Sequence, residues 1–203
     1  MKWIKSSVWP SLGEIDRAGL AEHPGLAALA YHPVTAPAAR RVDALKAQRS
    51  LIIRLLVRLP LRSPDVCALE LDRSLRCIQG RWQVELPVTE HVISEPSRPV
   101  DTYQALFPAD LVWQLEEFID IWRPWLPGEH RSELFTTRRG QPFDARTLNH
   151  EIIHVLQRRT RYAIGLAQLR RLRVQTFLTG AANFRVRLCY SASRLIRSPD
   201  MAS

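Results

Sequence analysis

The spacing of apolar residues along the chain predicts four main helices. In residues 37–59 leucines and isoleucines recur every three or four positions, which is the period of one face of an α-helix. The segment that begins at Pro108 shows the same period over about four turns. Its apolar positions are Leu111, Leu115, Phe118, Ile119 and Trp122. Shorter helices are expected over residues 64–71 and 145–161, the second of them with Asp144 as its N-cap.

Residues 76–87 follow a different pattern, in which apolar and polar side chains alternate as they do in a half-buried strand. The alternating residues are Trp82, Gln83, Val84, Glu85 and Leu86. Gly80 suits the turn of a β-hairpin. Residues 134–136 read as a short strand followed by a turn at 138–141, whereas residues 88–105 read as polar and irregular. The predicted fold class is mainly α with a small antiparallel β-sheet, an α+β fold.

Length and composition predict one globular domain, because 203 residues with 46% hydrophobic content can bury a sizeable core. Residues 1–36 contain scattered prolines and read as an irregular N-terminal segment with a short helix near residues 12–20. Residues 37–165 hold the predicted helices and strands and form the expected domain core. Residues 166–203 change to Arg, Leu, Ala and Ser, and form a basic C-terminal segment of uncertain structure.

The excess positive charge lies at one end of the chain. Residues 1–154 contain 16 arginines and 3 lysines against 19 acidic residues, whereas residues 155–203 contain 10 arginines and one acid, Asp200. The net charge of +9 therefore belongs to the last quarter of the sequence. Such a block is typical of a surface that binds a polyanion, most simply nucleic acid. A solvated basic tail is the alternative interpretation.

Several classes of protein are not expected from this sequence. The longest apolar run, residues 51–59, is interrupted by Arg54 and Arg58, so we expect no membrane partner. The first ten residues lack a continuous apolar stretch, so no signal peptide is expected either. The three cysteines, Cys67, Cys77 and Cys189, lack the spacing of a metal site or a disulfide framework. We expect a reducing, cytoplasmic environment, no metal and no cofactor.

Arg62 occupies a sharp corner between two predicted helices. Pro60 ends the first helix, and Ser63 and Pro64 suit the N-cap and first turn of the second. Free amide groups and the helix dipole attract anions at such a helix N-terminus. A guanidinium beside them makes a good phosphate seat. A structural arginine at the end of a helical hairpin is the alternative.

The same corner resembles a known family. Pro60-Leu61-Arg62 followed by Val66-x-x-Leu69-x-Leu71 is similar to the first-arginine box of tyrosine recombinases, the phage-integrase family. The order helix, helix, hairpin, helix, short strand, helix resembles their catalytic domain, and residues 134–143 resemble its strand–turn–helix. The likeness covers residues 42–165. It implies a tyrosine-recombinase-like catalytic domain that performs DNA integration and recombination, with DNA and other recombinase subunits as partners.

The resemblance also implies which residues would act. Arg62 would touch the scissile phosphate, Arg171 would be the second arginine of the family's His-x-x-Arg box, and Tyr190 would form the phosphotyrosyl link. Residues 170–173 offer an alternative register for the second arginine. Fixed cations matter because the transition state at phosphorus is highly anionic. Basic residues expected to bind DNA are Arg138, Arg139, Arg158, Arg159, Arg170 and Arg173.

Three departures from the family pattern weaken the expected catalysis. No lysine occurs after Lys46, although the family places one after the hairpin. Gln168 stands where the second box has its histidine, and Tyr190 follows Arg171 more closely than the family's nucleophile usually does. Catalytic groups that act as a unit lose most of their rate when one is removed. We therefore expect an incomplete recombinase that binds DNA without completing strand exchange.

A second motif supports a different class of function. Residues 150–154 read His-Glu-Ile-Ile-His, the spacing with which a helix presents two zinc ligands and a general base in metallopeptidases. His150 and His154 would be the ligands and Glu151 the base. No His or Glu follows His154 to serve as the usual third ligand. Three functions stay open at this point: a DNA strand transferase, a non-catalytic DNA-binding protein and a zinc peptidase.

Overall fold

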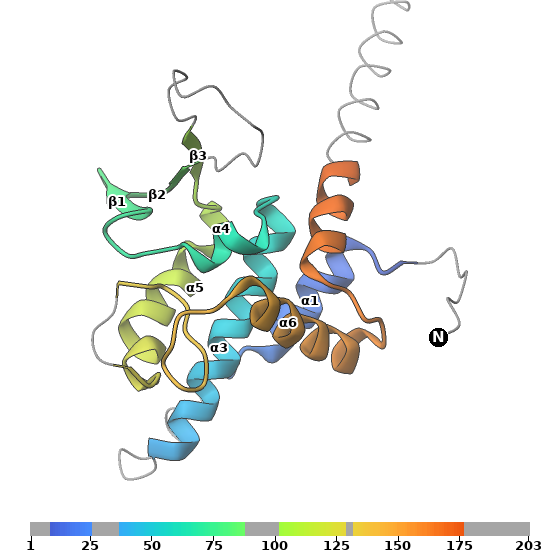
Figure 1. Cartoon of the computed structure of the whole chain (residues 1–203), viewed down its shortest axis with the longest axis horizontal. Coiled ribbons are helices and arrows are strands. Elements are labelled where there is room, and N and C mark those ends of the chain that lie inside the picture. The colour runs from blue at the N-terminus through green and yellow to red at the C-terminus, as the bar shows by residue number, and fades with distance from the viewer. Residues whose placement is uncertain (1–8, 26–36, 88–101, 129–131, 177–203) are drawn as a thin grey trace, which may run out of the picture.

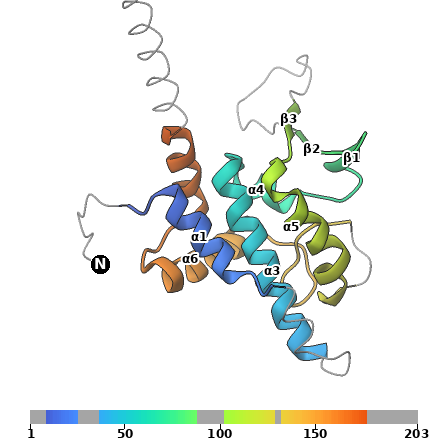
Figure 2. The same cartoon turned by 180° about the vertical axis from the view of Figure 1, so that it is seen from behind.

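A long central helix organises the structure, and the other elements pack around it. The computed structural model describes residues 9–25, 37–87, 102–128 and 132–176. Helix α3 (Pro37–Arg58) runs through the middle (Figure 1). Helices α1 (Leu12–Glu22) and α6 (Ala145–Thr160) lie on one side of α3, and α5 (Val112–Glu117) lies on the other (Figure 2). The predicted α+β class is confirmed.

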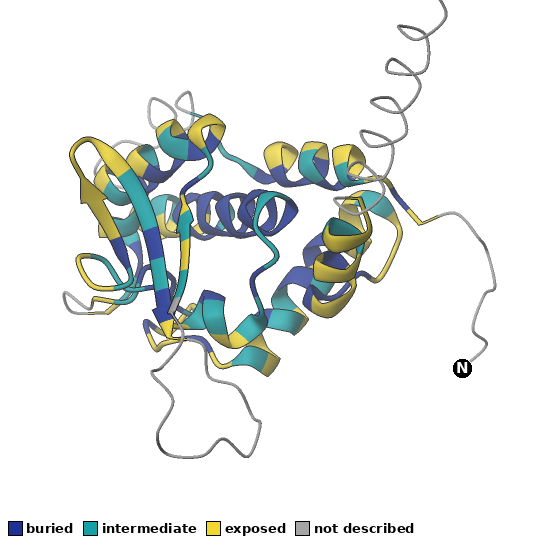
Figure 3. Ribbon diagram, turned by 90° about the horizontal axis from the view of Figure 1, so that it is seen from above, coloured by how far each residue is buried: buried dark blue, intermediate teal, exposed yellow. Residues whose placement is uncertain are grey.

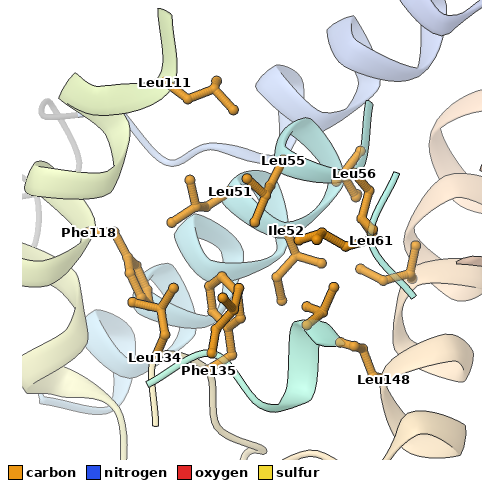
Figure 4. Close-up of a cluster of buried hydrophobic side chains, with 14 of the residues drawn as sticks. Leu51, Ile52, Leu55, Leu56, Leu61, Leu111, Phe118, Leu134, Phe135 and Leu148 are labelled. Atoms are coloured by element: carbon orange, nitrogen blue, oxygen red, sulfur yellow. The ribbon is translucent and has the colours of Figure 1, made fainter. Parts of the chain in front are cut away.

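Helix α3 is buried on almost every side from residue 43 to residue 57 (Figure 3). The spacing of apolar residues predicted one apolar face. In the structure neighbouring elements cover the helix on nearly all sides, so α3 is a core helix and not a surface helix. Its leucines and isoleucines lie in one cluster with side chains from the turns before and after α5, from α6 and from the 134–136 segment. The close-up in Figure 4 labels Leu51, Ile52, Leu55, Leu56, Leu61, Leu111, Phe118, Leu134, Phe135 and Leu148.

The segment after Pro108 forms a helix with irregular ends. A 3-10 turn (Ala109–Leu111) leads into α5, a π-type turn (Phe118–Trp122) continues it, and a second 3-10 turn (Arg123–Trp125) ends it. Four of the five predicted apolar positions in this segment are buried, and Ile119 is partly buried against the core. Helix α6 begins as predicted, because the Asp144 carboxylate accepts hydrogen bonds from the N–H groups of Arg146 and Thr147 at 2.9 and 2.8 Å.

The sheet has three antiparallel strands in the order β1 (Leu75–Ile78), β2 (Arg81–Pro87), β3 (Thr102–Leu106). The predicted hairpin is confirmed, with Gln79 and Gly80 at positive φ in its two-residue turn. The prediction of irregular structure over residues 88–105 is wrong for its end, because β3 pairs with the outer edge of β2. Backbone pairing with β2 holds these residues as a strand, although their own polar sequence does not indicate one.

The helix predicted over residues 64–71 is shorter than expected. Helix α4 spans Ser63–Cys67, with Arg62 rather than Ser63 as its N-cap. The chain leaves the helix because residues 69–71 pair with the strand-like segment 132–134: Leu71 N–H donates to the Ser132 carbonyl and Leu134 N–H to the Leu69 carbonyl, both at 2.8 Å. Two long-range backbone hydrogen bonds thus replace another helical turn.

Residues on both sides of the predicted 37–165 core contribute to the same packing. Helix α1 lies against α3 so closely that a Cβ on Gly19 would meet Ile53 and Arg54 atoms at 2.9 Å. At the other end, residues 166–176 form a helix whose Leu166 and Leu169 are fully buried. No helix among the described residues has the length and apolar character needed to cross a membrane.

Candidate functional site

Arg62 is held in a fixed orientation by Asp65. The Arg62 backbone N–H donates to Asp65 Oδ2 at 2.8 Å, and its guanidinium donates to the two carboxylate oxygens from Nε at 3.0 Å and Nη2 at 3.1 Å. One carboxylate therefore caps α4 and also binds the side chain in the two-pronged geometry that favours arginine. The Arg62 side chain is 33% exposed, so the guanidinium is fixed and still accessible to solvent.

Arg62 opens onto a pocket of about 310 Å³, which we call the Arg62 pocket. It is lined by Pro60, Leu61, Arg62, Asp65, Leu86, Pro87, Tyr103 and Arg170. These residues come from α4 and the corner before it, from strands β2 and β3, and from the 166–176 helix. Arg170 forms no ion pair or hydrogen bond with other described residues. The pocket therefore brings together two arginines that lie far apart in the sequence.

The 166–176 helix brings Arg170 to the pocket because its first turn is anchored to α6. Leu166 N–H donates to Asn149 Oδ1 and Gly165 N–H donates to Gln168 Oε1, both at 2.9 Å. Leu169 is buried, which leaves its neighbour Arg170 directed outward. The Gln168 side chain thus supports the start of this helix.

Tyr103 is a residue of this pocket that the sequence analysis missed. It lies on β3, in the stretch read as irregular, and it is half-buried beside Asp65. Burial raises the pKa of the Tyr103 phenol, and the negative charge of Asp65 raises it further. The hydroxyl therefore keeps its proton at neutral pH and can donate a hydrogen bond to an anion.

The structure separates Arg171 and Arg173 from the Arg62 pocket. Arg171 is exposed on the 166–176 helix and does not line the pocket. Arg173 turns toward the C-terminus of α3, where its Nε donates to the Arg58 carbonyl at 3.0 Å. Consecutive helical residues point about 100° apart, so Arg171 points away from the side on which Arg170 reaches the pocket. Tyr190, the predicted nucleophile, lies outside the described residues.

Arg158 and Arg159, two of the arginines predicted to bind DNA, hold α1 to α6. Glu22, which is 2% exposed, accepts a hydrogen bond from Arg158 Nη2 at 3.0 Å and from Arg159 Nη2 at 2.9 Å. The arginine side chains remain 59% and 39% exposed, so each retains a solvent-facing surface. Arg138 and Arg139 are exposed in the turn after residues 134–136.

The His150-Glu151-x-x-His154 motif lies on α6 but does not have the surroundings of a zinc site. Both histidines are exposed, and Glu151 Oε1 accepts a hydrogen bond from Arg49 Nε at 2.6 Å. A carboxylate paired with a nearly buried arginine is poorly placed to activate water. Among the described residues, no group of three His, Cys, Asp or Glu side chains is close enough to hold a metal ion.

Cys67 is also unsuited to catalysis. Burial raises the pKa of its thiol to about 11, and the charge of Asp144 contributes in the same direction. The thiol is therefore protonated at neutral pH, and a thiol attacks as the thiolate.

We compared the chain with known protein families, curated proteins and solved structures, and none of them matches it. Functional inference therefore depends on the pockets and charges of this chain.

Proposed function

We propose that this protein binds DNA in the manner of a tyrosine recombinase, with a backbone phosphate seated in the Arg62 pocket. The observation that supports this proposal most is that Arg62 and Arg170 line the same pocket. A recombinase-like active site needs two arginines on one phosphate. The two arginines lie far apart in the sequence, and the fold brings both to one pocket of about 310 Å³.

The chemistry of the pocket suits a phosphate diester. Two arginines outweigh one aspartate, so the lining carries a net positive charge. Asp65 fixes the Arg62 fork before a ligand arrives, which lowers the ordering cost of binding. The protonated Tyr103 hydroxyl adds a neutral donor, and the apolar prolines and leucines around it exclude water and strengthen these interactions.

We further propose that the domain holds DNA without completing strand exchange. A phosphotyrosyl link requires a tyrosine that reaches the phosphate as a nucleophile. Tyr103 is in the pocket, but its raised pKa makes it a hydrogen-bond donor. The catalytic role of Tyr190 and the partnership with other recombinase subunits remain predictions from the family resemblance.

DNA binding can be tested by fluorescence anisotropy with a labelled duplex at a series of salt concentrations. Arg62→Ala and Arg170→Ala should each weaken binding several-fold for any sequence, and each should reduce the slope of log affinity against log salt by about one. Arg146→Ala is the matched control, because Arg146 is exposed on α6 and does not line the Arg62 pocket. Equal effects of Arg62→Ala and Arg146→Ala would refute a phosphate in the Arg62 pocket.

Strand transfer is tested separately with a nicked suicide substrate, which traps any covalent protein–DNA adduct. We expect no adduct from the unaltered protein. An adduct that disappears in Tyr190→Phe would show that the protein is an active recombinase with Tyr190 as nucleophile. An adduct that disappears in Tyr103→Phe would assign that role to the tyrosine in the pocket.

A further inference from the structure

A second pocket, of about 480 Å³, lies along the exposed face of α6. We call it the α6 pocket, and its charged and titratable lining residues are Arg49, Arg138, His150, Glu151, His154 and Arg158. They come from the middle of α3, from the turn after residues 134–136 and from three successive turns of α6. The α6 pocket shares no lining residue with the Arg62 pocket.

The α6 pocket is more positive than the Arg62 pocket. Three arginines face one glutamate, before any contribution from the two histidines. Glu22 is buried and does not line the pocket. Its negative charge is offset by Arg159, whose Nη2 lies 2.9 Å from the Glu22 carboxylate. A concave surface that carries such a charge excess raises the local concentration of anions.

Two of the three arginines of the α6 pocket, Arg49 and Arg158, are held by ion pairs. Arg49 is 8% exposed, and its guanidinium pairs with Glu151 and lies 3.8 Å from Glu22. Arg158 is held by Glu22 at 3.0 Å. Side chains already ordered lose little entropy when a ligand binds. These two arginines of the pocket are therefore already ordered before a ligand binds.

Three further donors line the pocket. Arg138 forms no hydrogen bond or ion pair with other described residues, although it lines the pocket. His150 and His154 stand one turn apart on α6 and line the same pocket, where their ring N–H groups can donate. An arginine and two imidazoles in one positive cavity suit a group with several acceptor oxygens and a negative charge.

We propose that the α6 pocket binds a phosphate group, supplied either by the DNA backbone or by a small phosphorylated molecule. This assignment gives the His-Glu-x-x-His motif an anion-binding role in place of a zinc-binding one. It does not depend on DNA binding at the Arg62 pocket. Both sources present a tetrahedral phosphate with negatively charged oxygens, and the variants distinguish the two sources.

The test is a titration of the full chain with inorganic phosphate. Binding is monitored by ¹⁵N amide NMR in buffer that contains a metal chelator. Saturable shifts should appear at Arg138 and along residues 147–158. Arg138→Ala should weaken the apparent affinity at least about fivefold, the effect of losing one charge-assisted hydrogen bond. Arg146→Ala should leave it unchanged, and so should Arg62→Ala, which separates this site from the first pocket.

Arg138→Ala is informative because the exposed Arg138 supports no other described residue, so the fold should be retained. Arg158→Ala serves as the second variant, and Arg159 still holds Glu22 in it. Phosphate shifts that both variants leave unchanged, shifts that vanish in chelator, or no shifts at all would overturn the proposal. Loss of DNA affinity in Arg138→Ala would identify the DNA backbone as the source. Unchanged DNA affinity with lost phosphate binding would identify a small phosphorylated ligand.

Discussion

The Gln48 side chain attaches residues 134–136 to α3, and its replacement tests this attachment quantitatively. Its side-chain amide is 1% exposed and bonds the backbone of Thr136 on both sides. Nε2 donates to the Thr136 carbonyl at 2.8 Å, and Oε1 accepts from the Thr136 N–H at 2.9 Å. The amide therefore pairs with both backbone groups of Thr136, as a neighbouring strand would. We expect Gln48→Leu to be strongly destabilising.

The magnitude follows from the two backbone groups that lose their partner. Thr136 is 6% exposed, so water cannot easily replace the lost bonds. An unsatisfied buried donor or acceptor costs about 1–3 kcal/mol, so the loss of both partners should cost about 2–6 kcal/mol, with a central value of about 4 kcal/mol. Leucine is close to glutamine in size, so the cavity contribution is small.

The assay is urea unfolding followed by tryptophan fluorescence, read as the midpoint at constant slope. With a slope of about 3 kcal/mol/M, the midpoint should fall by about 1 M. Gln157→Leu is the matched control, because Gln157 is exposed on α6, and it should change the unfolding free energy by less than about 0.5 kcal/mol. If Gln48→Leu also stays within that limit, the 134–136 segment is not held as described.

Three further predictions concern pH, backbone geometry and metal. Burial lowers the pKa of His23 below its ordinary value of 6.5, with Arg54 adding to the effect and Glu117 opposing it, so the folded protein binds fewer protons than the unfolded chain. The contribution of His23 to stability should be complete above pH 6.5 and fall as pH decreases below it. In His23→Gln, the free energy of unfolding measured with urea should therefore depend less on pH over this range. Gly140→Ala should lower the thermal midpoint by about 4–8 °C, because φ is +74° and the new Cβ would meet a backbone oxygen at 2.3 Å, whereas Gly80→Ala, with open space around it, should cost much less. Metal analysis of protein purified without added zinc should find no stoichiometric zinc on the two α6 histidines, and a one-to-one ratio would restore the peptidase hypothesis.

Sequence reasoning worked best where a feature depends on neighbouring residues. The Asp144 cap, the Gly80 turn and the apolar stripe after Pro108 are local, and the structure confirms each. Strand β3 and the early end of α4 could not be predicted in the same way. Both depend on backbone pairing with segments distant in sequence, whose positions are set only by the fold.

The candidate site shows the same limit. Arg62 was identified from its corner, but the second arginine was predicted at Arg171, or at Arg173 in the alternative register, whereas Arg170 lines the pocket. Burial of Leu166 and Leu169 decides which side of the helix faces the core and hence which arginine reaches the pocket. The burial of Arg54 inside α3 could not be predicted from the sequence either, because its partner lies on another helix. Its Nη1 donates to Gln114 Oε1 on α5 at 2.7 Å.

A double-mutant cycle on DNA affinity tests the central claim most directly, because it asks whether Arg62 and Arg170 act on the same phosphate. The affinities of Arg62→Ala, Arg170→Ala and the double variant would be measured on one duplex at one salt concentration. If both arginines hold one phosphate, the second substitution should cost less after the first, with a coupling energy above about 0.5 kcal/mol. Strictly additive losses, or losses equal to that of Arg146→Ala, would contradict a shared phosphate in the Arg62 pocket.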